Sequence, residues 1–220
     1  KAQWALGTYT VTADANGGSI PSTSGWTDTG NTSTKNVVYT QEYGTLPEPT
    51  RTGYTFEYWR YENMKMPLIS RSEELNSTND PWDVDNEFVQ WTDLAPFIDT
   101  YGTNQTYNLE FDIKSANTTS NNNVDVYFQN GSTARYSFNK TISVSSSEWT
   151  HYNFDFKVSL KNSNTAAAML AFYGTYNTGN KPILKNLKFS LAPIVTSSST
   201  VTETQNHTIT AHWTPNTYTL

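Results

Sequence analysis

The sequence predicts a mostly β protein whose middle part folds as an eight-stranded jelly-roll β-sandwich. Apolar and polar residues alternate with a period of two in most segments, most clearly over 109–113, 124–128, 152–158 and 183–191. Turn-forming clusters such as Asn130-Gly131 bound these segments. Eight antiparallel strands at this spacing are typical of a two-sheet jelly roll.

The eight strands of the middle part follow one another with short connections. We expect them near residues 61–69, 87–92, 106–115, 123–129, 134–142, 149–158, 166–174 and 181–191. The pattern also predicts a short helix around Gln90 to Thr100 and a turn of helix at Ser70 to Leu75.

Composition excludes several classes of function. The net charge is −6, so bulk charge argues against binding to nucleic acid or to an anionic membrane. No segment approaches the ~18 apolar residues of a membrane span. The chain has no cysteine and only three histidines, which excludes disulfides and argues against a structural zinc site. No start of a signal peptide opens the sequence, so we expect any such peptide to lie outside it.

The two ends of the chain resemble each other. Ala2-Gln3-Trp4 followed by Thr8-Tyr9-Thr10-Val11 recurs as Ala211-His212-Trp213 followed by Thr217-Tyr218-Thr219-Leu220. The recurrence predicts a tandem array in which neighbouring repeats of the same chain are partners. Chance is the alternative, because short Trp/Tyr/Thr strings are common in β-proteins.

The outer segments carry a more specific pattern. The strings YTVTADANGGSIPS, YGTLPEPTRTGYTFEYW and TVTETQNHTITAHWTPNTYTL resemble the Listeria–Bacteroides repeat family, the B-repeat of listerial internalins and many Gram-positive surface proteins. The resemblance covers about 80 residues and implies a small β-grasp-like module with Trp59 and Trp213 in or near its core.

The sequence departs from this family in one respect. In B-repeats the Gly-Tyr-x-Phe-x-x-Trp segment is followed within about ten residues by a Thr-Val-Thr strand. Here this segment ends at Trp59, and Thr200-Val201-Thr202 follows ~140 residues later. The departure predicts an insertion at an exposed turn of the repeat. We therefore expect a discontinuous B-repeat-like module at 1–59 plus 194–220 and an inserted jelly roll at 60–193.

The inserted segment resembles a second group of proteins. Its strings EWTHYNFDFKV, AMLAFYGTY and PILKNLKFSLA look like the closing half of galactose-binding-type jelly rolls, a fold that many carbohydrate-binding modules share. The resemblance implies a binder of polysaccharide or host glycan. Because a fold does not fix a function, the residues must supply the site.

Strand parity predicts a polar face for such a site. If the strands share one sheet, its planar amide, guanidinium and carboxylate groups can form hydrogen bonds to sugar hydroxyl groups while an aromatic ring stacks on the sugar. The residues of this face are Glu110, Asp112, Tyr127, Gln129, Arg135 and His151. An ordinary solvated sheet face is the alternative.

Two loops add further candidates. Exposed aromatic residues at one end of a sandwich form ligand platforms, which favours Trp82, Tyr173 and Tyr176 as ligand-binding residues. Asp83 and Asp85 alternate with Glu87 as oxygen ligands do in calcium loops, so they are candidate ligands of a structural calcium ion. An acidic solvated loop is the alternative.

The sequence predicts no catalytic residue. It contains no Gly-x-Ser-x-Gly elbow, no His-Glu-x-x-His motif and no phosphate loop, and no other cofactor signature. The leading hypothesis is a non-catalytic, secreted adhesion module on the cell wall or surface of a Gram-positive bacterium. The alternatives are a structural spacer or protein-interaction stalk module, and an accessory domain of a secreted glycoside hydrolase.

Overall fold

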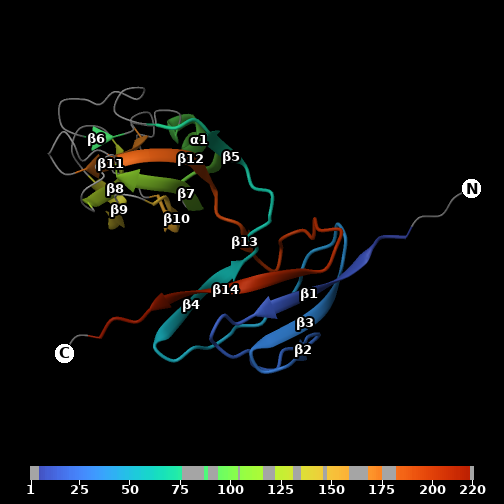
Figure 1. Ribbon diagram of the computed structural model, residues 1–220. Helices are drawn as coiled ribbons and strands as arrows, with labels where there is room; N and C mark the ends of the chain where they lie inside the picture. Colours follow the sequence, from blue (N-terminus) through green and yellow to red (C-terminus); the bar gives the residue numbers. More distant parts are fainter. Residues whose placement is uncertain are drawn as a thin grey trace, which may run out of the picture. The chain divides into compact units, whose positions relative to one another are not determined.

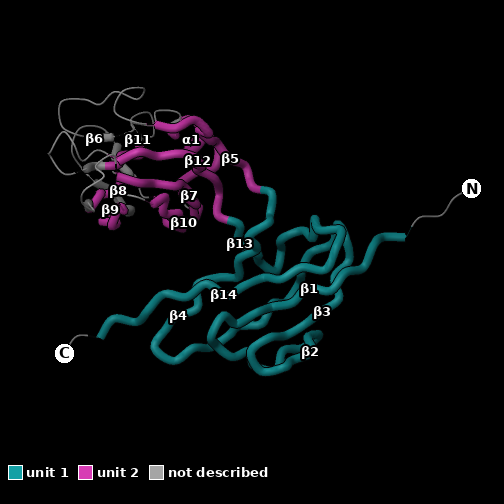
Figure 2. Tube along the Cα trace, in the orientation of Figure 1, with its two compact units in different colours: residues 1–65, 193–220 teal, residues 66–192 magenta. Residues whose placement is uncertain are grey.

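The chain divides into two compact units. The computed structural model describes residues 5–75, 87–88, 94–103, 105–115, 122–130, 135–145, 148–158, 168–174 and 182–218. Residues 1–65 with 193–220 form one unit, here called the outer unit, and residues 66–192 form the inner unit (Figure 2). The division falls at 65/66 and 192/193, close to the expected boundaries at 59/60 and 193/194.

The outer unit is built on one mixed sheet. Its strands, as far as the structure describes them, lie in the order β13-β4-β14-β1-β3-β2 (Figure 1). Their bounds are β1 Thr8–Asp14, β2 Thr27–Asp28, β3 Thr32–Val38, β4 Tyr54–Arg60, β13 Ile194–Val195 and β14 His207–Pro215. The central strands β1 and β14 are parallel, and β3 and β4 flank them antiparallel. Residues 39–53, which connect β3 to β4, contain no helix.

The core of the outer unit contains both tryptophans that the repeat resemblance indicates. Trp59 is 2% exposed, and its indole Nε1 donates a hydrogen bond to the carbonyl oxygen of Pro47 at 2.8 Å. Trp213 is half-buried against the same core and donates to the carbonyl oxygen of Ala15 at 2.9 Å. Both indole N–H groups thus have partners, as buried tryptophan requires.

The chain leaves and re-enters the outer unit at neighbouring positions. It leaves after β4 and returns at β13, and these strands pair with Ile194 opposite Arg60 and Val195 opposite Trp59. The amide of Tyr61 also donates to the carbonyl oxygen of Pro193 at 2.9 Å. The two ends therefore lie about one strand spacing apart, ~4.8 Å, which is the geometry that an insertion at a turn requires.

The inner unit is a sandwich of two four-stranded sheets within the described residues. The strands lie in the orders β10-β7-β12-β5 and β6-β11-β8-β9. Their bounds are β5 Leu68–Arg71, β6 Glu87–Phe88, β7 Thr106–Ser115, β8 Asn122–Asn130, β9 Arg135–Val144, β10 Thr150–Lys157, β11 Ala168–Gly174 and β12 Pro182–Leu191, with one helix, α1, at Leu94–Tyr101.

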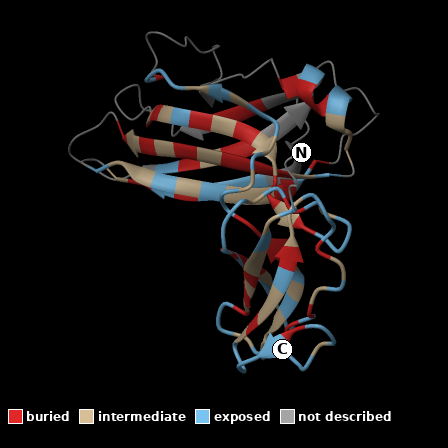
Figure 3. Ribbon diagram, turned by 90° about the vertical axis from the view of Figure 1, so that its right-hand side faces the viewer, coloured by how far each residue is buried: buried red, intermediate tan, exposed pale blue. Residues whose placement is uncertain are grey.

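The two sheets of the inner unit enclose one apolar core. The alternating residues Leu109, Phe111 and Ile113 of β7 are fully buried, as strand parity predicts. Phe111 meets Phe172 of the opposite sheet edge-to-face, with ring centroids 4.9 Å apart. Buried and exposed residues alternate along the strands of both units (Figure 3), and the alternation confirms the mostly β prediction.

Two local predictions differ from the structure. The expected turn of helix at Ser70 to Leu75 is wrong, because Leu68–Arg71 pairs as strand β5 with β12 and Leu75 forms a bridge with Leu184. Pairing with a neighbouring strand overrides local propensity here. The expected strand at 61–69 is also wrong over 61–67, where the chain forms no strand, and β5 begins only at Leu68. The helix expected around Gln90 to Thr100 is found as α1, Leu94–Tyr101, while residues 90–93 lie outside the described residues. Among the described helices, none has the length and apolarity to cross a membrane.

Candidate functional site

The predicted polar face is divided between the two sheets of the inner unit. Glu110 and His151 lie on β7 and β10 of one sheet, whereas Tyr127, Gln129 and Arg135 lie on β8 and β9 of the other. The prediction of one shared face is therefore wrong. Alternation along a strand tells which residues share a side, but it does not tell which strands share a sheet.

Tyr127 does not present its ring to solvent. Its side chain is 0% exposed, and so is that of the preceding Val126. Strand β8 thus buries successive residues, which point to opposite faces of the sheet. The prediction of an exposed Tyr127 assumed that only one face of this strand is covered, and it is wrong for that reason.

The other candidates are placed only in part. Gln129 of β8 pairs with Arg135 of β9, and Tyr173 of β11 lies opposite Asp125 of β8. The side chains of Gln129, Arg135 and Tyr173 are outside the described part of the structure. Trp82, Tyr176, Asp83 and Asp85 also lie outside the described residues, so their roles stay predictions. Within the described part of the chain, no three acidic or histidine side chains gather as a metal site.

Glu110 and His151 belong to a group of side chains on the solvent side of the neighbouring strands β10, β7 and β12. His151 lies opposite Asp112 in the strand register, and its Nδ1 lies 2.9 Å from Oδ1 of Asp112. Lys188 Nζ donates to Oε1 of Glu110 at 2.9 Å. We call this set the polar row; its members are Glu110, Asp112, Lys114, Trp149, His151, Lys185, Asn186 and Lys188.

A bulge in β12 brings Asn186 to Asp112. The register of β12 against β7 shifts between Lys185 and Lys188, and Asn186 has a φ of 53°. Asparagine tolerates this left-handed conformation better than other residues with a side chain, apart from aspartate. A bulge re-aims the side chains beside it, and here Asn186 Nδ2 donates to Oδ2 of Asp112 at 2.7 Å.

These contacts fix the ionisation of Asp112. Partial burial by itself would raise the pKa of Asp112, but hydrogen bonds from Asn186 and His151 outweigh it and hold the pKa below its ordinary value. Asp112 is therefore a carboxylate at neutral pH and accepts a hydrogen bond from the N–H of His151 Nδ1. The imidazole is held in one orientation while the His151 side chain remains 55% exposed.

Trp149 is the residue of the row that the strand-parity argument missed. It is half-buried just before β10, and the Nζ atoms of Lys185 and Lys114 lie 4.1 Å and 4.7 Å from its ring centroid. Trp149 precedes His151 by two residues, so the same period of two would have placed it on this face.

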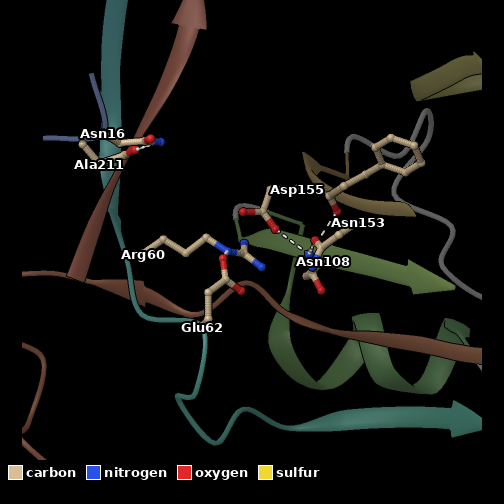
Figure 4. A network of polar contacts seen from close by, with 8 residues as sticks. Asn16, Arg60, Glu62, Asn108, Asn153, Asp155 and Ala211 are labelled. Carbon is tan, nitrogen blue, oxygen red and sulfur yellow. Dashed lines mark hydrogen bonds and ion pairs between the residues drawn. The ribbon is translucent and has the colours of Figure 1, made fainter. Parts of the chain in front are cut away.

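Amides and a carboxylate line β7 and β10 beyond Glu110. Asn108 Nδ2 donates to Oδ1 of Asp155 at 2.7 Å and also to Oδ1 of Asn153 (Figure 4). Asn108 is buried although it lies on the polar side of β7. From Trp149 to Asp155 the polar side of β10 extends over about 20 Å at ~3.3 Å per residue.

The outer unit holds a separate hollow with aromatic walls. A pocket of about 670 Å³ is lined by Tyr54, Phe56 and Trp213 together with Thr50, Thr52 and Thr55. The guanidinium carbon of Arg51 lies 3.9 Å from the ring centroid of Tyr54. This pocket is a second candidate ligand site in the described part of the chain.

Comparison with known proteins reveals distant likeness in fold. No family model matches the chain, and no curated protein matches it. A solved structure titled "CBM4 structure and function" is 13% identical, with a TM-score of 0.35 over 65% of this chain and 74% of that chain. The CBM22-1 xylan-binding domain of Paenibacillus barcinonensis is 13% identical, with a TM-score of 0.36 over 70% and 94%.

A third solved structure is a virus-like particle of the extra small virus of the giant freshwater prawn Macrobrachium rosenbergii. It is 12% identical, with a TM-score of 0.21 over 67% of this chain and 90% of that chain. The described part of the chain is mostly β and forms several sheets, as its own strand pairing shows.

Proposed function

We propose that the inner unit is a non-catalytic glycan-binding module. The single observation that carries the proposal is the polar row, where the half-buried indole of Trp149 shares one face of the sheet with a histidine and two carboxylates that are already hydrogen-bonded in place. Sugars offer an apolar C–H face to an aromatic ring, and they offer hydroxyl groups to planar polar groups. Side chains held in place before binding lose less conformational entropy when a ligand arrives.

The arrangement of the strands supports the finer fold assignment. Numbered from β5 to β12, the strands of the inner unit lie in the orders 6-3-8-1 and 2-7-4-5, the alternation between two sheets that a jelly roll requires. The parallel central pair of the outer unit supports a β-grasp-like, B-repeat-like module. In this proposal the outer unit displays the inner one at the cell wall or surface of a Gram-positive bacterium.

Repetition would compensate for weak binding by a single module. Glycan sites of this open, solvated kind bind weakly because much of the sugar stays in water. Linking several modules in one chain gives effective concentrations near millimolar and raises the overall avidity. Neighbouring repeats of the same chain are therefore part of the proposal.

A structural spacer is the second candidate, and one observation favours it. Within the polar row each carboxylate already has a cationic or amide partner, Lys188 for Glu110 and both His151 and Asn186 for Asp112. A face whose charges satisfy one another is stable without a ligand. The spacer and the glycan binder differ in whether any sugar occupies the row.

Replacing Trp149 by alanine tests the proposal. We expect Trp149→Ala to weaken binding about 10- to 30-fold, ~1.4–2 kcal/mol, because the ring supplies the stacking surface. A glycan array on the wild-type protein identifies the ligand, and isothermal titration of the full chain measures the loss. Tyr218→Ala is the matched control, since it removes an aromatic side chain that is 77% exposed.

Two outcomes would contradict the proposal. An array that reveals no bound glycan even at high protein concentration leaves the spacer as the function. Loss of binding in Tyr54→Ala, with Trp149→Ala unchanged, would place the site in the pocket of the outer unit.

A further inference from the structure

The first and last long strands of the outer unit are neighbours in its sheet. Strand β1 pairs with β14 in parallel, from Val11 opposite His207 to Asp14 opposite Thr210. Because the strands are parallel, the chain enters β1 at one end of the pair and leaves β14 at the other end (Figure 1).

Side chains lengthen this pairing at both ends. The amide of Thr10 donates to Oδ1 of Asn206 at 2.8 Å. At the other end, Asn16 Nδ2 donates to the carbonyl oxygen of Ala211 at 3.2 Å (Figure 4). Trp213 Nε1 adds the bond to the carbonyl oxygen of Ala15. The connection therefore extends from residue 10 to 16 on one side and from 206 to 213 on the other.

This geometry determines how the pair responds to tension. Pulling the chain before β1 and after β14 drives the two strands in opposite directions along their own axes. The hydrogen bonds between strands cross this direction, so all of them bear the load together. Pulling apart two adjacent ends would instead break the same bonds one after another.

The inner unit lies outside the path of this force. Its residues 66–192 follow β4 and precede β13, and both of those strands lie within the stretch of chain that the β1–β14 pair closes. We propose that the β1–β14 pair is a mechanical clamp that carries tension along the chain and keeps it from the inner unit. This function is independent of glycan binding.

Two attachment geometries test the clamp by single-molecule force spectroscopy on the full chain. The chain has no cysteine, so handles can be attached at chosen positions alone. Handles at Leu6→Cys and Tyr218→Cys apply force along the length of the β1–β14 pair. Handles at Leu6→Cys and Gln205→Cys pull apart the two adjacent ends of the pair. All three residues are exposed. We expect a higher unfolding force in the first geometry, and an equal or lower force there would overturn the proposal.

The side-chain bonds at the ends of the pair supply a second test. Asn206→Ala with Asn16→Gly removes two of them, and glycine at 16 keeps the left-handed backbone, whose φ is 48°. We expect unfolding at constant force to be about tenfold faster, which corresponds to ~1.4 kcal/mol. Ser33→Ala is the matched control, because it removes a partly buried hydrogen bond to Thr27 between β2 and β3, which is not a bond between β1 and β14.

The order of events tests the shielding of the inner unit. Its 127 residues, 66 to 192, release about 430 Å of chain at ~3.4 Å per residue. In the lengthwise geometry we expect this step only after the outer unit has opened. A step of this length that precedes the opening of the outer unit would overturn the proposal. An unfolding rate of Asn206→Ala with Asn16→Gly equal to that of the wild type would also overturn it.

Discussion

Replacing Phe111 by alanine will unfold the inner unit at temperatures where the outer unit stays folded. Phe111 is fully buried on β7 and meets Phe172 of the opposite sheet, while Tyr152 and Phe154 of β10 pack beside it. Removing a buried phenylalanine costs ~3–5 kcal/mol through lost burial and the cavity left behind. The loss is a large part of the ~5–15 kcal/mol that stabilises an ordinary domain.

Differential scanning calorimetry of the full chain measures this effect. We expect the transition of the inner unit to fall by about 10 °C or more while that of the outer unit stays in place. Phe111→Leu is the control, since it keeps most of the apolar volume and should cost less. A variant in which both units shift together would contradict the separation of the two cores.

Trp59→Ala will destabilise the outer unit and leave the inner unit folded. It will lower the melting temperature of its unit by more than Phe111→Ala does. Trp59 is 2% exposed in the core of the outer unit, and its loss costs ~3–5 kcal/mol. The substitution also leaves the carbonyl oxygen of Pro47 without its donor, which adds to the cost if the carbonyl stays buried. We expect the melting temperature of the outer unit to fall by about 15 °C or more.

The same calorimetric experiment checks Trp59→Ala, with Trp59→Phe as its control. Phenylalanine keeps an aromatic ring near Phe56, whose centroid lies 5.5 Å from that of Trp59, but it lacks the N–H donor. We expect Trp59→Phe to fall between the wild type and Trp59→Ala. If the inner unit lost as much stability as the outer one in Trp59→Ala, the two units would not be separate.

Most strand positions in the inner unit were predictable because their signal is local, but the first strand is β5, Leu68–Arg71, and not 61–69. The period of two over Leu109 to Ile113 depends only on which side of one strand is buried, and both the expected and the observed strand cover 106–115. The assignment of strands to sheets depends on contacts far apart in sequence. Glu110 and Tyr127 therefore looked equivalent in the sequence, although they lie in different sheets.

The candidate site shows the same limit. Glu110 and His151 were predictable as polar residues on strands with one buried face. The bulge that brings Asn186 to Asp112 was not, because it arises from the pairing of β12 with β7 and leaves no local pattern. The prediction that Tyr127 is exposed was wrong for a related reason, because the residues that cover the second face of β8 come from elsewhere in the fold.

The most direct test of the account is to separate the two units. The amide of Tyr61 bonds to Pro193, so a short glycine-containing turn can replace residues 66–192 in the outer unit. We predict that this shortened chain and the isolated fragment 66–192 each melt in one cooperative transition, close to the temperatures they show in the full chain. A fragment that lacks cooperative unfolding, or an outer unit that no longer folds without it, would contradict the claim that one domain is inserted in another.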